Sequence, residues 1–295
     1  MQRFRDKQIV DRIVADGRPR VVKIFGDLGA AAEIKRRSPG TLVVGHINQP
    51  YGFQEVLTSS TNDMAAYATD FVTQHLSQYQ ANPDVDYWEG HNEPVLQTVS
   101  KMALYGLFEA ERVRLMASYG LKCAVGNFST GNPPFEQWDD FFPALRAVKQ
   151  HGGALALHEY SAPVMDYGFD RASGEGWLTC RYRQVYRQFV PPDLQVPILI
   201  TETGIDGLVT DRPGPSGSGW QDFIDYWKTL PLDRDPFWAY LDQLQWYDEE
   251  LQKDEFVIGA AIFVAGALDD FGSYEIAGEM GELFTRYLAA HPAPV

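Results

Sequence analysis

The stretch Tyr87-Trp88-Glu89-Gly90-His91-Asn92-Glu93-Pro94 decides the expected fold, because it reads as a short buried strand that stops abruptly. Tyr87 and Trp88 suit a pleated, half-buried surface. Pro94 cannot donate to a sheet ladder, and it pushes the residue before it towards an extended conformation. We therefore expect Glu93 at the carboxyl end of a strand, which is where a parallel α/β barrel carries its catalytic groups.

A second stretch further along the chain repeats this design. Pro197-Ile198-Leu199-Ile200-Thr201-Glu202-Thr203-Gly204 is an apolar run, then a glutamate, then a glycine turn. Glu93 and Glu202 thus stand at the ends of two expected buried strands. Two such glutamates predict chemistry performed by a pair of carboxylates.

The alternation of strands and helices sets the expected fold class. Apolar runs near residues 21, 41, 86, 121, 154, 196 and 257 predict strands, with helical patterns between them, and no boundary divides 1–295 into two domains. Such a chain forms a parallel sheet covered by helices. A closed barrel needs eight strands and opens with a strand, whereas this chain opens with a helix over 4–16. We therefore predict an α/β fold of the (β/α)8 TIM-barrel type whose first strand is missing. Its two open edges would permit a homo-oligomer.

The overall composition excludes several classes of partner. The net charge of −15 argues against nucleic acid, because phosphate binding needs a basic face. No apolar run approaches the ~18 residues of a membrane span, and no apolar segment follows the first charged residues as in a signal peptide. The compartment stays open, since a signal could have been removed. Cys123 and Cys180 are far apart, which favours two buried free thiols over a disulfide framework or zinc cluster.

At this point the residues resemble a known family. Asn92-Glu93-Pro94 on one strand and Thr201-Glu202-Thr203-Gly204 three strands later are similar to clan A glycoside hydrolases, with families 5 and 39 nearest. The resemblance covers about 21–276. It implies a retaining β-glycosidase that acts on an oligo- or polysaccharide by double displacement, with no cofactor and no metal. In that clan the acid/base ends the fourth strand and the nucleophile ends the seventh, so the strand near 21 would be the second.

The resemblance also implies a role for each carboxylate. Glu202 would be the nucleophile, and Glu93 would protonate the leaving oxygen and then deprotonate the attacking water. Retaining enzymes hold these two groups roughly 5–5.5 Å apart. Each carboxylate disfavours ionisation of the other, so we expect one of them, Glu93, to hold a proton near neutral pH.

Further residues are expected to bind the sugar. Asn92 resembles the clan's asparagine that bonds the sugar 2-hydroxyl. His158 and Tyr160 alternate on one strand and point the same way; by resemblance Tyr160 would bond the nucleophile and His158 the sugar. Other polar groups near strand ends are expected to line the cleft: His46, Asn48, Glu89, His91 and Asn127.

The last strand departs from the clan's pattern. The clan commonly has a tryptophan there as a platform for the sugar, whereas this chain has Phe263 with Phe271 downstream. Trp177 and Trp220, on long loops, are expected to supply stacking instead.

Two other functions remain open from the sequence. A barrel that misplaced its carboxylates would be a non-catalytic glycan-binding protein, because about 1 Å of error can cost ~100-fold in rate. A metallohydrolase site could use His46, His91, His158 and Glu159, although the i, i+2 spacing of paired ligands on one strand is absent. Alternation along the strand is also expected to turn Glu159 away from the barrel.

Overall fold

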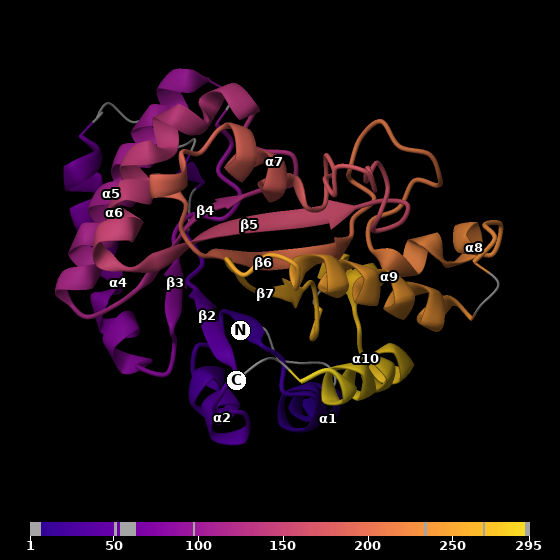
Figure 1. Cartoon of the computed structure of the whole chain (residues 1–295). Coiled ribbons are helices and arrows are strands. Elements are labelled where there is room, and N and C mark those ends of the chain that lie inside the picture. The colour runs from indigo at the N-terminus through magenta and orange to yellow at the C-terminus, as the bar shows by residue number, and fades with distance from the viewer. Residues whose placement is uncertain are drawn as a thin grey trace.

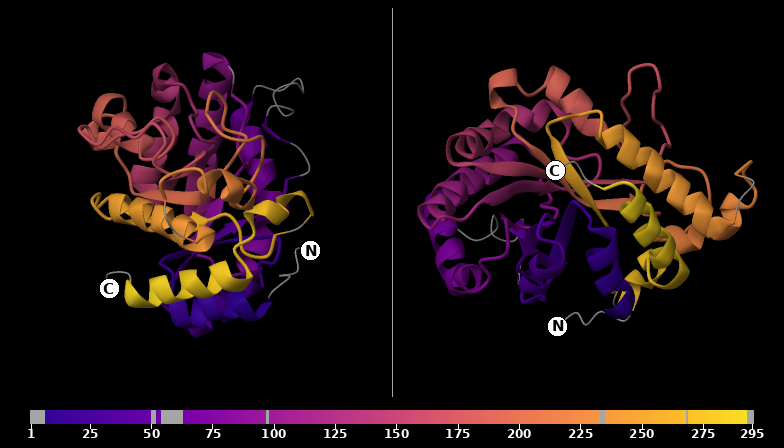
Figure 2. Two further views of the ribbon diagram at one scale, coloured as in Figure 1. Left: turned by 90° about the vertical axis from the view of Figure 1, so that its right-hand side faces the viewer. Right: turned by 60° about the horizontal axis from the view of Figure 1, so that its bottom comes forward.

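The computed structural model describes residues 7–49, 52–53, 63–96, 98–232, 235–267 and 269–292. Within these residues, seven parallel strands form one nearly closed barrel surrounded by helices (Figures 1 and 2). The strands are β1 (Val21–Phe25), β2 (Leu42–His46), β3 (Tyr87–Glu89), β4 (Cys123–Phe128), β5 (Gly153–Ser161), β6 (Ile198–Ile205) and β7 (Val257–Ile262). The predicted strand count and the TIM-barrel type of fold are confirmed.

Helices connect each strand to the next on the outside of the barrel. They are α1 (Lys7–Arg12) with the π-helical turn Ile13–Gly17, α2 (Ala30–Arg37), α4 (Met64–Ala81), α5 (Val99–Ser118), α6 (Phe142–His151), α7 (Arg181–Gln188), α8 (Ile224–Trp227), α9 (Pro236–Leu251) and α10 (Gly278–Ala290). Residues 4–6 of the predicted opening helix lie outside the described residues. Side chains cap several starts: Asp63 accepts a hydrogen bond from the Ala66 N–H, and Thr98 accepts one from Lys101.

The apolar core has two parts. A large outer cluster lies between strands and helices, whereas a small inner cluster fills the barrel itself. Most members of the inner cluster are small or β-branched, and they are Val21, Val44, Ala124, Ala154, Ala156, Leu199 and Ala261. Because successive side chains on a strand alternate in direction, the same inward faces present polar groups nearer the carboxyl ends. The packed inner cluster therefore lies nearer the amino ends of the strands than these polar groups do.

A seam separates the first and last strands. The sheet order runs from β1 to β7, and no ladder among the described residues joins these two strands. They nevertheless approach closely, because a Cβ added to Gly259 would lie 2.8 Å from Cγ2 of Val21. Except for Ala261, the residues of β7 stay only half-buried, unlike those of β5. The predicted break between the last strand and the strand at 21 is thus found as a missing ladder, but the two edges touch.

The two ends of the chain pack together beside this seam. In Figures 1 and 2 the first and last helices, α1 and α10, lie side by side. Their approach requires a glycine, since a Cβ on Gly281 would come within 2.4 Å of Ile9 Cγ1. The outer layer is therefore continuous across the place where the sheet is interrupted.

Two global predictions are also answered by the fold. Cys123 and Cys180 are both buried free thiols, as predicted. Among the described helices, none combines the length and the apolar character needed to cross a lipid bilayer.

Candidate active site

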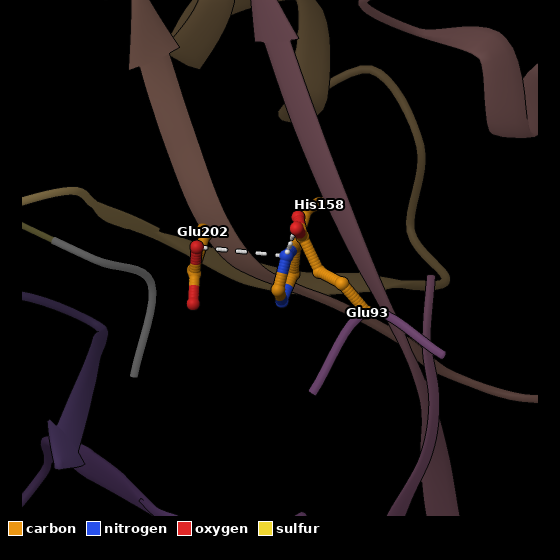
Figure 3. Close-up of side chains that lie close together, drawn as sticks. All are labelled: Glu93, His158 and Glu202. Carbon is orange, nitrogen blue, oxygen red and sulfur yellow. Dashed lines mark hydrogen bonds and ion pairs between the residues drawn. The ribbon is translucent and has the colours of Figure 1, made fainter. Parts of the chain in front are cut away.

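Glu93 and Glu202 meet at the carboxyl ends of the strands, with His158 between them (Figure 3). One carboxylate oxygen of each glutamate and a ring nitrogen of His158 all lie within 4.8 Å of one another. His158 Nδ1 is 2.8 Å from Glu93 Oε1 and 3.5 Å from Glu202 Oε2. Residues far apart in the sequence therefore converge, because the ends of parallel strands share one rim of the barrel.

A tightly held turn after β3 carries Glu93. The Glu93 backbone N–H donates to the Asn127 carbonyl at 3.0 Å, and the Asn127 amide donates to the His91 carbonyl at 3.2 Å. Glu93 and Asn127 both adopt left-handed backbone angles, with φ of 41° and 48°, so the extended conformation expected for Glu93 before Pro94 is wrong. Such angles are uncommon for residues other than glycine, so this turn persists because its hydrogen bonds enforce it.

The buried ion pair of Arg112 and Glu109 packs against the turn that carries Glu93. Arg112 donates to Glu109 Oε2 at 2.7 Å, to the Trp88 carbonyl at 3.1 Å and to the Ala124 carbonyl at 3.0 Å. Gly90 packs directly on this pair, since a Cβ there would lie 2.8 Å from Glu109 Oε1. Arg112 thereby fixes the ends of β3 and β4 relative to each other.

Glu202 lies deeper than Glu93 and has more partners. Its side chain is 14 % exposed, against 40 % for Glu93. Tyr160 O–H donates to Glu202 Oε2 at 2.7 Å, and Lys23 Nζ donates to Oε1 at 2.7 Å. Burial by itself would raise the pKa of Glu202, but the charges of His158 and Lys23 and these hydrogen bonds outweigh it. Its pKa therefore lies below its ordinary value, and Glu202 is held as a carboxylate.

Lys23 connects Glu202 to a second buried carboxylate, that of Glu89. The Lys23 ammonium is 2.9 Å from Glu89 Oε2, and His46 Nδ1 is 3.1 Å from the same oxygen. Burial opposes ionisation of Lys23, but the two glutamates raise its pKa above the usual value. Sequence reasoning missed Lys23, although an ammonium inside Val-Val-Lys-Ile-Phe is unusual enough to have marked it.

A cavity of about 1690 Å³ opens at the two glutamates. At the rim it is lined by Asn92, Tyr160, Asp206, Phe263, Phe271 and Tyr274. It continues down the seam between β1 and β7 to Arg18 and Arg20 at the opposite ends of the strands. The cavity thus follows the line along which, among the described residues, no ladder joins these two edges.

The other predicted sugar-binding residues differ in position. Asn92 is exposed and lines the cavity, and Phe263 packs edge-on against Tyr160 and Phe271 at its wall. Asn48 is exposed on the loop after β2. Trp177 is 56 % exposed on the loop after β5, and its ring meets Phe135 edge-on.

Five predicted positions are corrected by the structure. His46 and Glu89, expected to line the cleft, are each 2 % exposed and lie against each other inside the barrel. Trp220 is 2 % exposed and stacks on Tyr240 with its ring centroid 5.0 Å away, so it has no free face for a sugar. Asn127 is completely buried and serves the Glu93 turn instead of the cleft. His91 lies among aromatic rings and contacts Tyr67 O–H at 2.9 Å. Loop and turn residues can face either way, and the sequence pattern did not fix their direction.

The metal site suggested by the sequence does not assemble. Glu159 points outward, as predicted, and accepts hydrogen bonds from the Cys180 and Arg181 N–H groups and from Tyr247 O–H. Burial raises the pKa of this carboxyl to about 7. The donor atoms that could jointly hold a divalent ion are instead those of Glu93, His158 and Glu202. The Lys23 ammonium already neutralises part of this set.

Comparison with known proteins identifies the fold. No protein family matches the sequence, and no curated protein is significantly similar to it. A β-glucuronidase from an uncultured Clostridium species superimposes with a TM-score of 0.54 at 11 % identity, over 97 % of this chain and 46 % of that one. An endo-β-1,4-mannanase from Thermotoga petrophila gives 0.50 at 12 % identity, over 98 % and 73 %.

A third similar structure carries a bound sugar acid. It is the GH2 β-galacturonidase from Eisenbergiella tayi bound to galacturonate, with a TM-score of 0.52, 14 % identity and coverage of 96 % of this chain and 47 % of that one. The chain thus spans about half the length of the β-glucuronidase and the β-galacturonidase. It shares the barrel fold of these glycoside hydrolases.

Proposed function

We propose that this protein is a retaining β-glycoside hydrolase in which Glu202 is the nucleophile and Glu93 the acid/base. The carboxylate spacing carries the proposal. Oxygens of the two glutamates lie within 4.8 Å of each other, which is near the roughly 5–5.5 Å of retaining enzymes and below the ~6.5–9.5 Å of inverting ones.

The surroundings of Glu202 support the nucleophilic role. A nucleophile must be ionised and must keep one orientation while it attacks the anomeric carbon. Tyr160 holds one oxygen and Lys23 the other, each at 2.7 Å. Attack breaks the bond to the leaving oxygen and gives a glycosyl ester on Glu202, which water later hydrolyses.

The position of Glu93 supports the proton-transfer role. It is the more exposed of the two carboxyls and lies at the cavity wall, where a leaving group and then a water can reach it. In the first step Glu93 gives its proton to the leaving oxygen. In the second it takes a proton from the attacking water, and His158 Nδ1, 2.8 Å away, keeps it oriented between the steps.

The cavity offers a place for the sugar ring beside this pair. Asn92 reaches the cavity next to Glu93 and is assigned to the 2-hydroxyl. Phe263 and Phe271 also line the cavity and offer aromatic surface on which sugar rings stack. The endo or exo mode of cleavage depends on the loops of the rim.

Stereochemistry tests the proposal most directly. Proton NMR of an aryl β-glycoside digest should show the β-anomer of the product first, and appearance of the α-anomer first would disprove retention. Glu202→Gln should abolish turnover. Glu93→Ala should lose about 10²–10⁴-fold in rate and recover with azide as an added nucleophile. Glu279→Gln, a matched change at an exposed helix residue, should keep full activity.

The rival function is a glycan-binding barrel without catalysis. It predicts sugar binding with no turnover of any aryl glycoside, even one with a good leaving group. The close approach of the two carboxylates favours the enzyme.

A further inference from the structure

We propose that the cavity accepts uncharged sugars and rejects uronic acids, and that Asp206 is the residue that enforces this choice. The inference rests on the proposed glycosidase function and adds the charge class of its substrate. It runs against the names of two similar structures, a glucuronidase and a galacturonidase, whose likeness extends to the fold alone.

Several carboxyl side chains gather around the carboxylate pair. Asp206 follows Glu202 at the end of β6 and lines the same cavity. Burial raises the pKa of Asp206, whereas the hydrogen bonds from Leu208 and Tyr274 favour its charged form and partly offset this. The carboxyl groups gathered at this end of the barrel are those of Glu89, Glu93, Glu202 and Asp206.

The positive groups near these carboxylates are already engaged. Lys23 is shared between Glu89 and Glu202 at 2.9 and 2.7 Å. The two Nη atoms of Arg212 donate to the carbonyls of residues 207, 213 and 215, while its Nε is buried without a hydrogen-bond partner. Arg212 is not among the residues that line the cavity, so a substrate there does not reach its guanidinium. Burial lowers the pKa of His46, which keeps this imidazole neutral. None of these three described side chains presents a free positive charge to a substrate carboxylate in the cavity.

Asp206 itself has capacity for a sugar hydroxyl. Its Oδ1 accepts from Tyr274 O–H at 2.8 Å and from the Leu208 N–H at 2.9 Å. Its Oδ2 has no hydrogen-bond partner among the described residues. These two bonds fix the carboxyl orientation and leave one acceptor for the ligand. A hydroxyl would donate to it in a charge-assisted hydrogen bond, whereas a carboxylate at the same place has no proton to give.

The expected size of the discrimination is large. A uronate carboxylate about 5–6 Å from Asp206 meets like-charge repulsion that, at an effective dielectric constant of about 20, corresponds to roughly 100-fold in kcat/KM. Water in the cavity reduces this value. We therefore expect a neutral glycoside to be preferred over its uronide by about 100-fold.

Paired aryl glycosides test this choice. The kcat/KM values of aryl β-glucoside and β-galactoside are compared with those of the matching glucuronide and galacturonide. Faster turnover of either neutral sugar than of its uronide supports the inference, and an equal or faster uronide overturns it while leaving the glycosidase function intact. If none of the four is cleaved, saturation-transfer NMR with glucose and glucuronate decides the charge preference independently of turnover; preferential binding of glucuronate overturns it.

The variant Asp206→Asn tests whether Asp206 causes the preference for uncharged sugars. Asparagine keeps an acceptor for Tyr274 and removes the charge, so the uronide-to-neutral ratio of kcat/KM should rise by about tenfold or more. A merely structural role would lower both rates together and leave the ratio unchanged, which would remove Asp206 from the proposal. Asp225→Asn makes the same change in net charge at a side chain that is 94 % exposed and should not move the ratio.

Discussion

Lys23→Met should shift the pH dependence of catalysis more than any other change outside the two glutamates. The ammonium contacts Glu202 at 2.7 Å and Glu89 at 2.9 Å, and the three side chains are 8 %, 14 % and 0 % exposed. Methionine fills similar space but leaves both carboxylates buried without this counter-charge. Unlike charges about 4 Å apart attract by about 4 kcal/mol at an effective dielectric constant of 20.

This energy converts into a pKa change. At about 1.4 kcal/mol per unit, its full loss corresponds to about 3 pKa units, and we expect about 2 because Tyr160 and His158 still hold Glu202. In the wild type the pKa of Glu202 lies below its ordinary value, so the carboxylate survives into acid. In Lys23→Met its pKa rises, and the acid limb of kcat/KM should move to higher pH by the same amount.

The assay is a pH profile of kcat/KM with an aryl β-glycoside that has a good leaving group. Lys35→Met is the matched control, because Lys35 pairs with Asp86 at 2.6 Å outside the cavity; its acid limb should stay in place. Lys23→Arg keeps the charge and separates electrostatics from a failure to fold. An unmoved acid limb in a folded Lys23→Met protein would refute the reasoning.

Three smaller perturbations probe the same framework. Tyr160→Phe removes the O–H that Glu202 accepts; hydrogen bonds to charged groups contribute about 1.5–3 kcal/mol, so kcat/KM should fall about 10–100-fold, measured by steady-state kinetics. Glu159→Ala leaves backbone N–H groups at the start of α7 without an acceptor, and urea unfolding should show a loss on the order of 3 kcal/mol. Dialysis against EDTA should leave activity unchanged. A loss of activity that zinc or magnesium restores would instead indicate that Glu93, His158 and Glu202 bind a catalytic metal ion.

The sequence was sufficient where strand geometry alone decides position. Glu93 and Glu202 were expected at one rim because each was predicted at the end of a buried strand, and parallel strands end on the same side. His158 and Tyr160 were expected to point together because side chains alternate, and both reach the carboxylate pair. For Glu202, His158 and Tyr160 these expectations needed neither the register of the strands nor the course of the loops. The position of Glu93 also depends on the turn after β3, whose backbone conformation was not expected.

The sequence was insufficient where partners depend on register or on loop packing. Lys23 and Glu89 meet because of the register of β1 and β3 on the two sides of β2, which no local pattern encodes. Trp220 stood in a glycine-rich region, which gave no sign that it would stack on Tyr240. Asp206 lies beyond the predicted strand end, in a turn whose hydrogen bond to Tyr274 joins distant segments.

The network around Lys23 also explains how an interrupted barrel can keep an ordered site. In the part of the chain that the structure describes, no ladder joins β1 to β7, so β1 is hydrogen-bonded in the sheet to β2 alone. Lys23 extends from β1 into the interior and contacts Glu202 on β6 and Glu89 on β3. These contacts tie the free strand to both walls at the level of the carboxylate pair. Loss of a buried ion-pair partner lowers the stability of a protein by about 3–5 kcal/mol. The ammonium that holds Glu202 ionised therefore also stabilises the position of β1 relative to β3 and β6.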